Sequence, residues 1–257
     1  MEIGKQSIRL EEPVYVESWA SVVGKKEGEG PLAVFFDEIE TDDQLGQNTW
    51  EEAESMLQQK AARLAVKKAG CTPEDIRIIF AGDLLAQSIA SSFGIGELDR
   101  PLYGLFGACS TMGEALSLGA ITLSAGHGER VLAVTSSHFA TAEKEFRFPL
   151  GYGSQRPLSA SWTVTGSGAC VLNRKKGKVK ITGLTTGKVV DYGLKDSQNM
   201  GACMAPAACS TIAQNLKDFG REPEAYDQII TGDLGTVGKE ILLQLVKDRG
   251  FDIETQY

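Results

Sequence analysis

Histidine and paired cysteine motifs are the scarcest features of this sequence. Only two histidines, His127 and His138, occur in 257 residues, which excludes a histidine-rich metal site. The five cysteines, at positions 71, 109, 170, 203 and 209, are an odd, scattered set without a CxxC pair. Such cysteine usage is typical of a reducing compartment.

Long hydrophobic runs and basic clusters are also missing. No apolar stretch approaches the roughly 18–20 residues that a membrane-spanning helix needs, and residues 1–7 lack the hydrophobic segment of a signal peptide. The chain carries 26 basic and 34 acidic residues, a net charge of −8, without a block of five or six basic residues. Nucleic acid is therefore excluded as a partner. A globular chain of one large domain or two smaller ones is expected.

The stretch 105–113, Leu-Phe-Gly-Ala-Cys-Ser-Thr-Met-Gly, is the part of the sequence that points to chemistry. A short apolar segment ends in a glycine, and apolar residues recur at helical spacing from Met112 onward. This pattern places Cys109 just ahead of, or in, the first turn of a helix, where unpaired N–H groups and the helix dipole activate a thiol. Cys109 is therefore a nucleophile or part of an anion pocket, and the alternative is a small buried residue at a tight turn.

Helices alternate with short apolar strands around this motif. Thr49 opens a capping box for a helix over 50–69, and Gly70 ends that helix. Further segments are apolar enough for buried strands, and they span residues 76–81, 101–106 and 130–135. The alternation predicts a layered α/β fold with a mixed, largely parallel sheet.

Polar residues follow two of the predicted strands where they end. Asp83 comes directly after the first, and Ser137 and His138 follow the strand over 130–135. Ligands of open α/β sheets gather outside the carboxyl ends of the strands, so these residues are candidates for a site. The polar, aromatic segment 141–157 is long for a loop in a compact domain, and such loops are usually functional or mobile.

An internal repeat recurs at an offset of 150 residues. Pro73-Glu74 returns as Pro223-Glu224, and Gly82-Asp83-Leu84 returns as Gly232-Asp233-Leu234. The order in both copies is helix, glycine stop, Pro-Glu turn, apolar strand and Gly-Asp-Leu, which indicates a duplicated fold. We expect an N-terminal half over 1–175 and a partial C-terminal half over 176–257. Because residue 257 corresponds to 107, the second copy is expected to be incomplete in this chain.

The chain resembles the thiolase and β-ketoacyl synthase superfamily and, within it, the stage V sporulation protein AD family of spore-forming bacteria. The duplication and the Gly-Ala-Cys-Ser-Thr turn support the superfamily. The narrower resemblance runs from about residue 29 onward and is supported by several segments, at 81–85, 105–111, 135–138, 140–143, 163–169, 196–198 and 204–208.

The resemblance implies a role in sporulation. Members of the family are expected to bind dipicolinic acid (pyridine-2,6-dicarboxylate), usually accompanied by calcium, and to need no cofactor. The expected partners are membrane proteins of the same sporulation operon, which would move the acid into the developing spore. It also implies a peripheral location on the cytoplasmic side of the forespore inner membrane, and a homodimer.

The resemblance also implies that condensation chemistry is lost in this chain. A condensing enzyme stabilises an enolate with histidine and asparagine, or with two histidines. Where short-chain ketoacyl synthases carry His-Gln-Ala-Asn, residues 231–235 here read Thr-Gly-Asp-Leu-Gly, and no histidine follows His138. An ionised Asp233 repels the charge that an imidazole would stabilise. A working acyltransferase that uses Cys109 and residues outside this chain remains the alternative.

A binder of a small dicarboxylate needs N–H donors, a cation and an apolar or aromatic wall. Donors would come from the helix that Cys109 precedes, a charged clamp from the polar loop, and the wall from a phenylalanine. The predicted ligand-binding residues are Cys109, His138, Asp83, Ser110, Ser137, Arg147 and Phe106. Three of them have a plainer alternative: His138 as a structural hydrogen-bonding group, Asp83 as a helix cap and Arg147 as a solvated charge.

Overall fold

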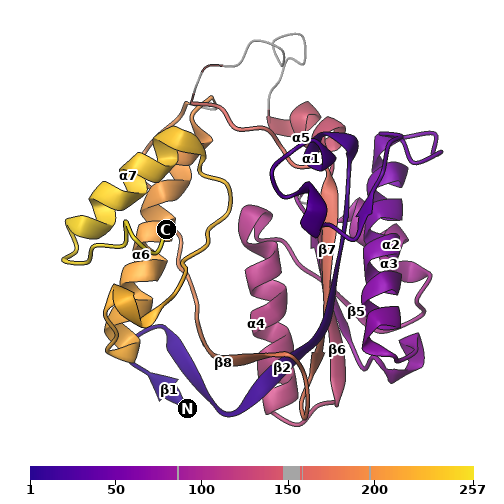
Figure 1. Ribbon diagram of the computed structural model, residues 1–257, viewed down its shortest axis with the longest axis horizontal. Helices are drawn as coiled ribbons and strands as arrows, with labels where there is room; N and C mark the ends of the chain where they lie inside the picture. Colours follow the sequence, from indigo (N-terminus) through magenta and orange to yellow (C-terminus); the bar gives the residue numbers. More distant parts are fainter. Residues whose placement is uncertain (86, 147–156, 158, 197) are drawn as a thin grey trace. The chain divides into compact units, whose positions relative to one another are not determined.

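The computed structural model describes residues 1–85, 87–146, 157, 159–196 and 198–257 (Figure 1). These residues form two compact units, each built from separate stretches of the chain. Unit 2 contains residues 12–145 and 163–182, and unit 1 contains residues 1–11, 146–162 and 183–257. Cys109 lies in unit 2. In the described part of the chain, no helix has both the length and the apolar character that crossing a membrane requires.

Unit 2 is built on a mixed sheet with the strand order β2-β7-β6-β4-β5. The strands are β2 (Ser7–Val23), β7 (Gly166–Asn173), β6 (Arg130–Ser137), β4 (Ile79–Asp83) and β5 (Leu102–Gly104), and the short β3 (Glu38–Ile39) pairs with β2. β4 is parallel to both β5 and β6, whereas β7 is antiparallel to β2 and β6. The predicted mixed α/β fold is confirmed.

Helices cover both faces of this sheet (Figure 1). α2 (Trp50–Ala69) and α3 (Ile89–Gly96) pack on one face, and α4 (Thr111–Ser124) packs on the other. The predicted ends of α2 are confirmed, because Thr49 forms a full capping box and Gly70 takes the left-handed conformation at φ 65°. Shorter elements connect these: α1 (Lys25–Gly28), η1 (Ala33–Phe35), η2 (Pro73–Asp75), η3 (Ala108–Ser110) and α5 (Phe139–Phe146).

The alternation of side chains along the central strands fills both layers. Ile79 and Ala81 of β4 join the buried cluster that contains Leu57 of α2. Phe80, between them in sequence, lies on the opposite face beside Gly119 of α4. Successive residues of a strand point to opposite faces, so a strand covered on both sides is apolar throughout. This is why the strands appear as continuous hydrophobic runs in the sequence.

Unit 1 contains the second copy of the repeat. Its elements are β1 (Glu2–Ile3), α6 (Met200–Phe219), η5 (Pro223–Ala225) and α7 (Gly235–Lys247), and β8 (Val179–Thr185) begins in unit 2 and ends here. α6 ends at Gly220 with φ 61°, as α2 ends at Gly70, and a Pro-Glu turn follows in both copies.

The predicted strand in the second copy of the repeat is wrong. Residues 226–234 form no strand in the part of the chain that the structure describes, although the equivalent residues of the first copy form β4. β4 has β5 and β6 as hydrogen-bonding neighbours, whereas this segment has a single backbone bond of the same kind, from Ile229 N to Gln256 O at 2.8 Å. A strand requires a partner on which to form a ladder, so the same apolar pattern stays irregular here.

Candidate functional site

The turn that carries Cys109 joins β5 to α4. Leu105 N donates to Ala81 O at 2.8 Å, which holds the chain against β4 as β5 ends. Ala108 then adopts φ 46°, a left-handed conformation that costs a residue with a side chain about 1 kcal/mol or more. Cys109 lies in η3, directly before the first residue of α4, as predicted, and its side chain is exposed.

Hydroxyl groups hold this turn together. Thr111 Oγ1 accepts from Gly107 N at 3.1 Å and donates to Ala108 O at 2.8 Å, and Ser110 Oγ donates to Gly107 O at 2.7 Å. The turn also needs the glycine at position 82, because a Cβ there would lie 2.4 Å from Leu105 O. The thiol is therefore presented to solvent by a turn that its neighbours fix.

The carboxyl end of the sheet gathers the predicted residues but divides them between two faces. Asp83 is level with Ser136 in the β4–β6 ladder, and Ser137 is level with Gly166 in the β6–β7 ladder. Ser136 bonds to side chains of α2, so Ser137, the next residue, faces the α4 side. Ser137 Oγ donates to Val164 O at 2.5 Å. Ser137 thus lies on the side of the sheet that α4 covers, and the segment that leads into α4 carries Cys109, Ser110 and the exposed Phe106.

Asp83 lies on the α2 and α3 side of the sheet. Its Oδ1 accepts from Leu85 N at 3.1 Å, and its Oδ2 accepts from Ser91 N at 3.1 Å and Ser91 Oγ at 2.8 Å. Ser91 N belongs to the first turn of α3, so the Asp83 carboxylate satisfies a backbone N–H of that turn, although the N-cap residue of α3 is Ser88 and not Asp83. The sheet separates Asp83 from Cys109.

A cavity of about 530 Å³ opens beside Asp83 on this side of the sheet. Its lining is rich in carboxylates, and the residues are Glu51, Glu54, Asp83, Leu85, Gln87, Ile89, Ala90, Thr141, Lys144 and Glu145. Lys144 pairs with Glu51 at 2.5 Å. No group of three or more histidine, cysteine or acidic side chains that could hold a metal ion occurs among the described residues.

Glu54 is the titratable residue of this cavity that the sequence reasoning missed. Its side chain is 1% exposed and accepts from Ser136 Oγ at 2.8 Å and Thr141 Oγ1 at 2.7 Å. Burial raises the pKa of Glu54 to about 7 against the effect of these hydrogen bonds, and the neighbouring acidic groups add to the rise. One signal was available: Glu54 and Gln58 stand four residues apart, next to Ala53 and Leu57 of the apolar stripe.

His138 is bound by its own chain. The Nε2 atom lies 2.9 Å from Asp43 O, and Nδ1 accepts from Ala140 N at 3.1 Å, which makes Nε2 the protonated nitrogen. The imidazole is buried and lies 5.4 Å from the ring of Trp50 at the start of α2. Burial lowers the pKa of His138, so the neutral form is favoured. Both nitrogens are thus used to position the turn after β6. Arg147, the predicted clamp, lies outside the described residues.

Solved structures identify the fold of the protein. The chain matches a 3-oxoacyl-(acyl carrier protein) synthase III of Xanthomonas oryzae with a TM-score of 0.62, at 16% identity over 94% of this chain and 82% of the other. It matches OleA of Xanthomonas campestris, in a structure bound to cerulenin, with a TM-score of 0.62 at 16% identity over 94% of this chain and 80% of the other. The fold is therefore that of the thiolase-like condensing enzymes.

Sequence comparison gives the family within this class. The family model for stage V sporulation protein AD matches residues 4–257. The stage V sporulation protein AD of Bacillus subtilis (strain 168) is 42% identical over 254 residues, which cover 99% of this chain and 75% of that protein. The chain belongs to the stage V sporulation protein AD family.

Proposed function

We propose that this protein binds dipicolinic acid without chemical turnover and serves the uptake of that acid into the developing spore. The ligand would lie at the Cys109 turn on the α4 face, between the thiol, the hydroxyls of Ser110 and Ser137, and the ring of Phe106. The observation that carries the proposal is family membership combined with an exposed thiol on a fixed turn at the carboxyl end of the sheet.

Asp83 and His138 contribute to this site indirectly. Asp83 holds the loop before α3, and His138 holds the turn after β6 through the backbone of residues 43 and 140. Because both His138 nitrogens are engaged, no free imidazole from this residue supports condensation chemistry. That arrangement favours binding over acyl transfer within the residues of this chain.

The protein would act at the cytoplasmic side of the forespore inner membrane, as a peripheral protein held by membrane proteins of its operon. A homodimer is the expected assembly. Flotation of forespore membranes with and without those partner proteins tests the location: the chain should float only when the partners are present. Light scattering tests the dimer.

Isothermal titration of dipicolinate, with and without calcium, tests the binding itself. Saturable heat is expected from the unchanged chain. Cys109→Ala and Phe106→Ala should weaken binding, the latter about two- to twelvefold, because an aromatic contact contributes roughly 0.5–1.5 kcal/mol. Cys203→Ala is the matched control, since it removes an exposed thiol from α6 in unit 1.

The alternative function is a condensing-type acyltransferase with Cys109 as nucleophile, which the exposed thiol and the shared fold also favour. Acyl-coenzyme A and mass spectrometry separate the two. Absence of heat together with rapid acylation of Cys109, lost in Cys109→Ala, would establish the transferase and reject the binder. If Cys109→Ala and Cys203→Ala gave equal heat, the proposal that the ligand binds at this turn would be rejected.

A further inference from the structure

The Glu54 carboxyl group joins three elements at the end of the sheet that carries the candidate site. It projects from α2 and accepts a hydrogen bond from Ser136 at the end of β6 and another from Thr141 in α5. Ser137 and His138 lie between those two hydroxyls in the chain. The turn after β6 is therefore fastened at both ends to one buried acidic group.

The hydroxyl of Thr141 has two acceptors but only one proton. Its Oγ1 atom lies 2.7 Å from Glu54 Oε2 and 2.9 Å from His138 O. When Glu54 is ionised, the hydroxyl proton goes to the carboxylate. When Oε2 carries a proton, Glu54 donates to Thr141 Oγ1, and the hydroxyl donates to His138 O instead.

Ser136 completes the arrangement in both charge states. Gln58 Nε2 donates to Ser136 Oγ at 2.9 Å, and the Ser136 hydroxyl donates to Glu54 Oε1 at 2.8 Å. This chain of bonds is unchanged by a proton on the other carboxyl oxygen. Glu54 therefore has hydrogen-bonding partners in both forms, so neither form incurs the free-energy cost of an unpaired buried polar atom.

The charged groups around Glu54 favour uptake of the proton. From β4, Asp83 is held by three donors. From α2 itself, Glu51 faces the same cavity but is paired with Lys144 of α5, and Glu145 of α5 adds a further carboxylate. Ser91 of α3 and Ser136 of β6 contribute hydroxyls rather than charges, and His138 is neutral. Burial, and then the charges of Asp83 and Glu51, raise the pKa of Glu54 to about 7.

We propose that Glu54 is a proton-operated latch on the turn after β6. Uptake of one proton reverses the Glu54–Thr141 hydrogen bond and adds a bond from Thr141 to His138 O, which tightens the turn that carries Ser137. The latch is a property of the free protein. Its effect on dipicolinate, tighter binding at lower pH, rests on the function proposed above.

Infrared difference spectroscopy of the free chain over a pH series tests the latch. A neutral carboxyl band should appear with a midpoint near 7 and vanish in Glu54→Gln. It should persist, at a lower midpoint, in Glu51→Gln, the matched control from the rim of the same cavity, because the Glu51 charge contributes to the raised pKa. Amide hydrogen exchange at residues 138–142, corrected for intrinsic rates, should slow roughly fivefold below the midpoint, the factor that one added neutral hydrogen bond supplies. Glu54→Gln, which mimics the neutral form, should stay slow at every pH.

Thr141→Val keeps the test decisive if Glu54→Gln fails to fold. This variant should retain a titrating band, at a higher midpoint, yet lose the change in exchange. A band that titrates only in the ordinary carboxylate range, or exchange that is independent of pH in the unchanged chain, overturns the proposal. Failure of dipicolinate to bind at any pH would reject the proposed function while leaving the infrared and exchange results to decide the latch.

Discussion

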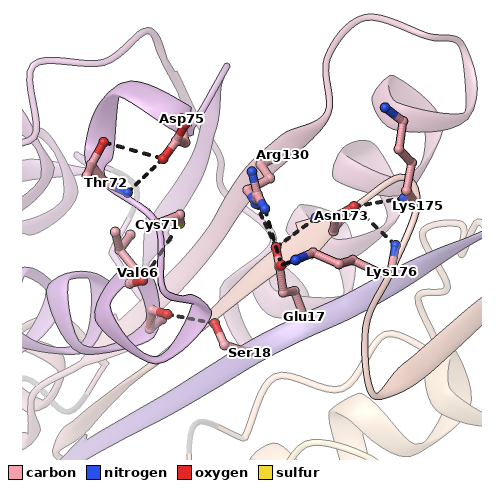
Figure 2. Close-up of polar contacts among 11 residues, drawn as sticks. Glu17, Ser18, Val66, Cys71, Thr72, Asp75, Arg130, Asn173, Lys175 and Lys176 are labelled. Carbon is pink, nitrogen blue, oxygen red and sulfur yellow. Dashed lines mark hydrogen bonds and ion pairs between the residues drawn. The ribbon is translucent and has the colours of Figure 1, made fainter.

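Replacing Glu17 with alanine should remove a side-chain hydrogen-bond network that joins β2, β6 and β7 of unit 2. Glu17 of β2 accepts from Arg130 Nε at 2.7 Å and Arg130 Nη2 at 3.3 Å, and from Asn173 Nδ2 at 2.8 Å (Figure 2). Lys176 Nζ lies 3.4 Å from the same carboxylate. The Glu17 side chain is 9% exposed and that of Arg130 is 19% exposed, so the variant leaves a nearly buried cation and an amide unpaired.

The expected loss follows from this burial. Removing one member of a buried ion pair costs roughly 3–5 kcal/mol, and partial rehydration of Arg130 reduces this to about 2–3 kcal/mol for Glu17→Ala. Glu17→Gln keeps acceptor and shape, so about half that loss is expected. The matched control is Glu129→Ala, because its partner Lys175 and Glu129 itself are 69% and 63% exposed. Exposed pairs contribute little, so the control should be nearly as stable as the unchanged chain.

The pH dependence gives a second readout of the same pair. Burial alone would raise the pKa of Glu17, but hydrogen bonds from Arg130 and Asn173 and the Arg130 charge outweigh it and lower the pKa. The folded pKa therefore lies below the unfolded value. The contribution is complete above the ordinary glutamate range and is lost as pH falls through the folded pKa. Urea unfolding at neutral and acidic pH measures both effects. Equal losses in Glu17→Ala and Glu129→Ala, or a deficit that does not shrink in acid, would refute the reasoning.

Three further changes test other parts of the chain. Gly82→Ala should lower the free energy of unfolding by at least about 2 kcal/mol and change the rate at which Cys109 is labelled, because the new Cβ would lie 2.4 Å from the backbone oxygen of Leu105. Gly113→Ala is the control: its Cβ would have no atom within 4 Å, so it should be neutral or stabilising. Gly201→Ala should loosen the α6–α7 contact, since its Cβ would lie 2.0 Å from Leu234 O, and calorimetry of the whole chain should show the loss of stability. Hydrogen bonds to Asp218 from the backbone and side chains of residues 5–7 and 214 overcome burial and lower its pKa to about 2. Its stabilisation should vanish only as pH falls toward that value, and Asp218→Asn should flatten this acid limb of the unfolding curve.

Local signals in the sequence were sufficient to predict the ends of α2 and the turn that carries Cys109. Thr49 and Gly70 mark the ends of α2 because caps and left-handed glycines satisfy the helix ends wherever the helix packs. The glycine and hydroxyls around Cys109 work in the same way, because their hydrogen bonds join residues within four positions of one another. The repeat and the family segments then indicated the fold.

Only the tertiary structure decided which predicted residues lie together. Asp83 and Ser137 both stand at strand ends, but strand alternation and ladder register place them on opposite faces of the sheet. The same holds for residues 226–234, whose apolar pattern resembles β4 but which lack the neighbours that make a strand.

Glu54 shows the physical reason why the sequence alone could not predict which residues form the site. In sequence it is an ordinary acidic residue of an amphipathic helix. Its altered proton affinity comes from burial and from Asp83, Ser136 and Thr141, which reach it from β4, β6 and α5. Helix caps and turns depend on neighbours along the chain and can therefore be predicted from the sequence. Burial and electrostatic environment depend on neighbours in space, which only the folded chain brings together.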